Sequence, residues 1–183
     1  MLPVYCVTHV PGLYPERQGV GPFGDEARLV RFFSKEWHDG DMPDLQAELV
    51  PEAYRAHLES LRSLLPEGAI RLSEINLHDG LIREVVCRGT ELHVVVRAGD
   101  LQVGYFDVRI EYSSAIVSQD ALSFLERAIG RRDVEVLYDE IDVVEGGGWK
   151  HSVLFCPYHE IAVRFDAVEL SVTNVSSRFE GAA

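Results

Sequence analysis

The sequence predicts an α+β fold, in which about seven to eight strands form a curled antiparallel sheet or partial barrel. Two or three helices are expected to pack on one side or end of that sheet. Apolar residues recur at helical spacing mainly before Gly80. After Gly80 they alternate with polar residues over short segments joined by turns, which is typical of half-buried antiparallel strands.

Residues 51–65 predict the clearest helix. Pro51 suits a first helical turn, and the apolar residues after it share one face (Tyr54, Leu58, Leu61 and Leu65). Pro66 and Gly68 are expected to stop this helix, and residues 43–48 predict a shorter helix before it.

Residues 25–37 allow two interpretations. They form either one amphipathic helix or a strand over residues 29–33, after which Ser34 caps a short helix. The β-favouring residues of the segment favour the second interpretation. Residues 1–27 are an extension with a short strand over residues 2–8 and a loop rich in glycine and proline.

The sheet is expected within residues 81–173. Residues 81–88 and 91–98 predict a hairpin, and the strand after it alternates apolar with polar residues (Phe106, Val108, Ile110 and Tyr112 on one side). A short helix is expected near residues 120–129. Four further strands follow, over residues 134–144, 149–156, 160–165 and 168–172. Residues 174–183 read as a polar tail, and the whole chain of 183 residues has the length of a single domain.

Composition disfavours several classes of function. The formal net charge is −13, from 30 acidic and 17 basic side chains, so nucleic acid would be repelled and a basic protein partner is the expected complement. No apolar run approaches the roughly 20 residues of a membrane span, and the start has no pattern of a secretory signal. The three unclustered cysteines (Cys6, Cys87 and Cys156) each lie in an apolar stretch and suit buried thiols in a reducing cytoplasm. Oligomeric state is left open.

His78 and Asp79 are the first candidate catalytic residues. Imidazole beside carboxylate is an acid–base pairing, and histidine titrates near neutral pH. Adjacent residues on an extended chain point to opposite faces, so the two need a turn to meet. The structural interpretation is that Asp79 closes a turn with Gly80 in a left-handed conformation, and that His78 ties the loop to a neighbour.

A second candidate is a metal site formed by Glu140, Asp142 and His151. Glu140 and Asp142 share one face of a predicted strand, and His151 lies across the predicted hairpin. The other interpretation is a charged edge strand, whose carboxylates discourage aggregation. The acidic run lacks the glycine spacing of a calcium loop.

Three short motifs carry a resemblance to a known family. They are an aromatic-Ser-Lys-Glu-Trp stretch at residues 33–37, a helix ending in Leu65-Pro66, and Leu77-His78-Asp79 before the strands. Together they resemble an uncharacterised family of bacterial proteins, a domain of unknown function. Ser34 stands where that family has threonine, and residues 1–27 have no counterpart in its pattern. The resemblance implies no known activity.

Three functions remain after the sequence is read. The first is a non-enzymatic binding or protein-interaction module, whose acidic surface meets a basic partner as in immunity-type proteins. The second is a metal-assisted hydrolase that uses some of five side chains, those of His78, Asp79, Glu140, Asp142 and His151. The third is a small-ligand pocket in the mouth of the curled sheet. The sequence has no nucleophile elbow, zinc-protease motif or phosphate loop, and therefore predicts no cofactor-binding residue.

Overall fold

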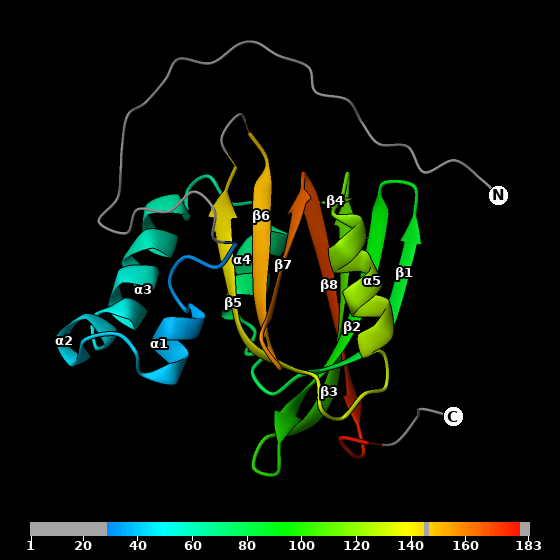
Figure 1. Cartoon of the computed structure of the whole chain (residues 1–183). Helices are drawn as coiled ribbons and strands as arrows, with labels where there is room; N and C mark the ends of the chain where they lie inside the picture. Colours follow the sequence, from blue (N-terminus) through cyan, green and yellow to red (C-terminus); the bar gives the residue numbers. More distant parts are fainter. Residues whose placement is uncertain (1–28, 145–146, 180–183) are drawn as a thin grey trace.

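The computed structural model describes residues 29–144 and 147–179, which contain eight strands in two antiparallel sheets (Figure 1). In order across the first sheet lie β1 (Leu81–Arg88), β2 (Glu91–Asp100), β3 (Gly104–Ser113) and β8 (Ala167–Val175). In order across the second lie β4 (Ile116–Val117), β7 (His159–Phe165), β6 (Trp149–Cys156) and β5 (Glu135–Val143). The α+β class is therefore confirmed. The described strands form no closed barrel, and the expected curled sheet or partial barrel is not confirmed.

A single core fills the space between the sheets. Strand β3 shows the predicted alternation, with Val108, Ile110 and Tyr112 at most 2% exposed and their neighbours half-buried. The second sheet contributes Phe155 and Phe165 to the same core. Alternate side chains along the strands thus point into this core and bury the inner face of each sheet, as in β-sandwiches.

The chain passes between the two sheets at a bend. Strand β3 leads into β4 and β7 leads into β8, so one antiparallel ribbon belongs to both sheets. At the bend the backbone N–H of Asp166 donates to the carbonyl of Ser113, and Ser114 has a positive φ of 56°. This sharp turn replaces the smooth curl that the alternation predicts.

The helices cover both open sides of the sandwich, not one side or end as expected, and the described residues form five helices where two or three were expected. Helix α4 (Glu67–Glu74) contacts β8 and β5, whereas α5 (Gln119–Ala128) contacts β1 and β7. Helix α3 (Val50–Leu61) packs on β5, and Trp37 of the short α1 (Lys35–Asp39) contacts Tyr138 of the same strand. The short α2 (Asp44–Ala47) lies at the outer end of this helical layer, away from the sheets (Figure 1). No helix in the described ranges is long and apolar enough to cross a membrane.

Helix α4 is the element that sequence patterns missed. Gly68 predicts a helix stop, yet it lies inside α4. A Cβ atom at this position would lie 1.7 Å from the carbonyl oxygen of Val168 in β8. Gly68 therefore allows α4 to pack closely on β8, because it has no side chain, and it does not end the helix.

The first described residues also correct a prediction. Residues 29–33 form no strand, although Ser34 does cap α1, since its hydroxyl accepts from the N–H of Trp37. The expected strand at residues 2–8 and the loop after it lie outside the described residues, as does Cys6. The predicted burial of the other two cysteines is wrong, since Cys87 and Cys156 are exposed. The predicted hairpin at residues 81–98, the short helix near residue 120 and the helix at residues 43–48 are confirmed.

Candidate functional site

His78 and Asp79 do meet, because the chain turns between them. Asp79 has a φ of 59°, and this places its carboxylate 3.5 Å from Nε2 of His78. The left-handed residue is Asp79, not Gly80 as expected. Nδ1 of His78 lies within hydrogen-bond distance of the backbone carbonyl oxygen of Leu137. A carbonyl oxygen can only accept a hydrogen bond, so Nδ1 carries the proton. The other ring nitrogen, Nε2, faces the carboxylate of Asp79. The predicted tie between loop and neighbour is confirmed.

The His78–Asp79 pair is an exposed surface pair. Its side chains are 41% and 55% exposed, and the His78 ring packs on Tyr138 at 5.2 Å between centroids. Neither the cavity between the sheets nor the groove beside Met42 is lined by these residues. The pair has acid–base chemistry but no enclosed space in which to hold a substrate.

Glu140 is a structural carboxylate on the outer face of β5. It is 3% exposed, and its oxygens accept from the backbone N–H groups of Arg31, Phe32 and Phe33 at 2.8, 2.6 and 2.6 Å. Burial raises the pKa of Glu140, and these three donors oppose that shift. Its three hydrogen bonds all come from the backbone of residues 31–33.

Residues 29–33 form a strap across the second sheet. Glu160 accepts from the N–H groups of Leu29 and Val30, and Val30 is fully buried against Leu137 and Leu154. Two carboxylates on the outer sheet face thus satisfy five successive backbone donors that lack a strand partner. The strap explains the acidic pattern of β5 better than a cation site does.

His151 points the opposite way, into the core. It is 2% exposed. Its Nδ1 lies 2.6 Å from the hydroxyl of Tyr112 in the first sheet, and its Nε2 lies 3.0 Å from Asp139. Since the Asp139 carboxylate accepts, Nε2 carries the proton and Nδ1 accepts from Tyr112. The result is a buried relay of three polar groups that joins the two sheets.

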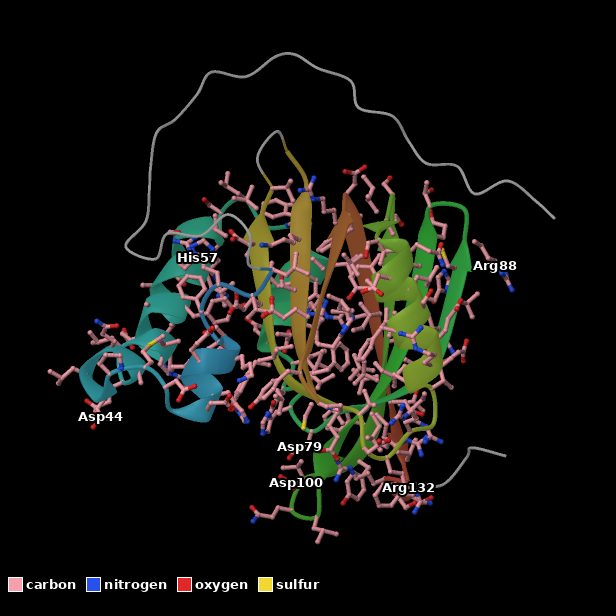
Figure 2. The ribbon with its side chains drawn as sticks, viewed as in Figure 1. Asp44, His57, Asp79, Arg88, Asp100 and Arg132 are labelled. Carbon is pink, nitrogen blue, oxygen red and sulfur yellow. The ribbon has the colours of Figure 1, made fainter. Side chains whose placement is uncertain are left out.

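Asp142 pairs with a helix instead of with a metal. Its carboxylate lies 3.0 Å from Nε2 of His57 on α3. Figure 2 labels His57 on the side of α3 that faces β5. Glu140, Asp142 and His151 therefore face three different sets of partners. No group of three or more histidine, cysteine or acidic side chains within residues 29–144 and 147–179 is arranged to hold a metal ion.

The core leaves little space for a ligand. The interior cavity beside Tyr112 and His151 has a volume of about 20 Å³, and its other lining residues are apolar. Pockets for small molecules usually exceed about 300 Å³. This cavity has the size of a single water molecule.

The helical layer carries a surface that sequence reasoning missed. Residues 39–52 contain no lysine or arginine and present exposed carboxylates, at Asp39, Asp41, Asp44, Glu48 and Glu52. Among them lie Leu45 and Leu49, which are 79% and 65% exposed. We name this surface the acidic helical corner, and Figure 2 shows Asp44 at its outer end, away from the sheets.

A small groove adjoins the acidic helical corner. It has a volume of about 30 Å³, and its lining combines apolar residues (Phe32, Met42, Leu49, Val50 and Ala53) with Gln46 and the basic Arg31. The signal for this surface was present in the sequence, because apolar residues at positions 45 and 49 within an acidic stretch leave one helical face unburied. The short helices there lack the periodicity that would have revealed which face is free.

Comparisons with known proteins give no relative. The sequence matches no family model and no curated protein, and the structure matches no solved structure. The chemistry of the surfaces above is therefore what a functional proposal has to rest on.

Proposed function

We propose that this chain is a non-enzymatic protein-interaction module, which binds a basic protein partner at the acidic helical corner. The observation that carries the proposal is the exposure of Leu45 and Leu49 among the carboxylates of Asp41, Asp44 and Glu48. The two outer carboxylates of the corner are ion-paired, Asp39 with Lys35 and Glu52 with Arg55. Exposed apolar side chains rimmed by like charges mark interaction surfaces.

The two kinds of residue have different roles in such docking. Burial of each leucine contributes about 1.5–3 kcal/mol if it is complete. The carboxylates attract a basic partner over distance and repel acidic proteins, so they act on association rate and on specificity. A partner of matching chemistry carries apolar side chains that cover Leu45 and Leu49, with lysine or arginine around them.

The hydrolase alternative has less support. Of its five residues, only His78 and Asp79 lie together at the surface, and the other three are engaged by the strap, by α3 and by Tyr112. The cavity between the sheets, at about 20 Å³, is too small for a small-ligand function. We further propose a bacterial cytoplasmic setting, which the unclustered cysteines and the family resemblance support.

Site-specific photo-cross-linking tests the proposal. A photoreactive amino acid replaces Leu49 in the full chain, and the matched control carries it at Leu101, which is 91% exposed on the β2–β3 turn. The species cross-linked at position 49 is identified and purified, and its binding is then measured by calorimetry at two salt concentrations. We expect a basic protein whose binding weakens with salt.

The double variant Leu45→Ser, Leu49→Ser decides the outcome. Both side chains are exposed, so the variant keeps its fold and its melting temperature. Loss of at least tenfold in affinity supports the proposal. Equal cross-linking at positions 49 and 101, or unchanged affinity in the double variant, overturns it.

A further inference from the structure

A second feature lies next to the acidic helical corner, at the turn between β6 and β7. Tyr158 is 43% exposed there, and the ammonium of Lys35 sits 4.5 Å from the centre of its ring. The carboxylate of Asp39 accepts from that ammonium at 2.5 Å and also from the Tyr158 hydroxyl. We call Lys35, His38, Asp39 and Tyr158 the Tyr158 site.

The Tyr158 site already holds a cation. An aromatic face attracts ammonium and guanidinium groups, and a carboxylate beside it adds a charge-assisted hydrogen bond. The hydrogen bond to Asp39 raises the pKa of Lys35, and the charges of Asp39 and Asp41 act in the same direction. The side chain of Lys35 is nevertheless 47% exposed, so its ammonium is open to exchange with solvent.

The Tyr158 site is continuous with the acidic helical corner. Asp39 belongs to both, since it ends α1 and begins the acidic segment. The indole Nε1 of Trp37 donates to the carbonyl of Ala47 at 2.9 Å and so fixes α1 against α2. A partner docked on Leu45 and Leu49 would therefore have this cation site at its border.

We propose that the Tyr158 site receives an arginine side chain of the partner, and that Lys35 fills the site in the free protein. The inference rests on the proposed function, because that function supplies the basic partner. Arginine replaces lysine here for a physical reason. Its planar guanidinium stacks on the ring and offers two parallel N–H groups to the carboxylate, whereas an ammonium offers a single point of charge.

The test is an NMR titration of the full-length chain with Nα-acetyl-arginine amide. Backbone amide shifts of His38, Asp39 and Tyr158 report binding, and Nα-acetyl-citrulline amide is the neutral isostere. In Lys35→Met the competing ammonium is gone, so the arginine probe should saturate these shifts at a concentration about threefold lower, as removal of an exposed ion pair predicts. Tyr158→Leu in the same background should abolish the saturable shift.

The matched control is Arg55→Met. Arg55 and Glu52 form an exposed ion pair on α3, and in the described residues no aromatic ring stacks on it. In this variant the arginine probe should cause only weak, unsaturable amide shifts near Glu52. Equal binding of arginine and citrulline probes, or no gain in Lys35→Met, overturns the inference. The titration uses no protein partner, so that result leaves the cross-linking test of the proposed function unaffected.

Discussion

The side chain of Glu140 and the backbone of Phe32, 108 residues apart in sequence, share a buried hydrogen bond of 2.6 Å. The same carboxylate also holds Arg31 and Phe33. This contact attaches the strap to the second sheet and so fixes the start of α1. The helical layer that carries both proposed surfaces therefore depends on a residue of β5.

Glu140→Gln should destabilise the protein by about 3 kcal/mol, because one amide oxygen replaces two carboxylate oxygens and the amide N–H₂ then faces backbone donors. The free energy of unfolding from urea titration measures this. Glu84→Gln is the control, since Glu84 is exposed and its nearest partner, Arg109, lies 3.6 Å away. If Glu140→Gln lowers the free energy of unfolding by less than about 1 kcal/mol, the strap is held by apolar contacts alone.

We expect the carboxylate of Asp142 to stabilise the folded protein at neutral pH and to lose this effect in acid. Burial opposes its ionisation, but hydrogen bonds from His57 and the Val143 N–H outweigh burial, and the pKa of Asp142 lies below its usual 3.8. A carboxyl with a lowered folded-state pKa stabilises the fold above its unfolded pKa. That stability is lost as pH falls through the folded value.

The measurement is the free energy of unfolding between pH 7 and pH 3 in the wild type and in Asp142→Asn. We expect the variant to be less stable at pH 7 and the difference to shrink below pH 4. Asp166→Asn, at an exposed bend, should leave the pH profile unchanged. A constant difference across the range would mean that the His57 contact does not depend on charge.

Period-two patterns predicted strands such as β3 and β7 well, because each of these buries one face and its sequence records that face. Strands β2 and β6 each bury five successive residues, so both of their faces are covered. The hairpin of β1 and β2 was nevertheless predicted. The candidate sites were less predictable. Glu140 and His151 look like ligands on one hairpin, but register opposes His151 to Ile141, so it faces the core while Glu140 faces outward. The spacing of residues along a strand shows which side chains share a face, but it does not show which face packs against the core.

The relay of Tyr112, His151 and Asp139 should stabilise the contact between the two sheets. Tyr112→Phe removes the hydroxyl and leaves Nδ1 of His151 buried without its donor, which should cost about 1–3 kcal/mol. Tyr105→Phe, on the outward face of the same strand, is the control and should cost little. Nitrogen shifts of the His151 ring provide a second readout, since the Nδ1 resonance should move when its hydrogen bond is lost.

Gly68→Ala tests the close packing of α4 on β8. In a free helix this change is stabilising by about 1 kcal/mol, because alanine has the higher helix propensity. Here the new methyl group would lie 1.7 Å from the carbonyl oxygen of Val168, so α4 must shift away from the strand. We expect a net destabilisation of about 1–3 kcal/mol, as in other overpacked sites.

Glu67→Ala provides the matched control for that variant. Glu67 begins the same helix and is exposed, so its replacement changes helix propensity little and adds no atom at the interface. Thermal unfolding of both variants separates propensity from packing. If Gly68→Ala melts at or above the wild-type temperature, helix and strand are not packed as closely as the 1.7 Å distance requires, and a backbone shift at Val168 must relieve the contact without cost.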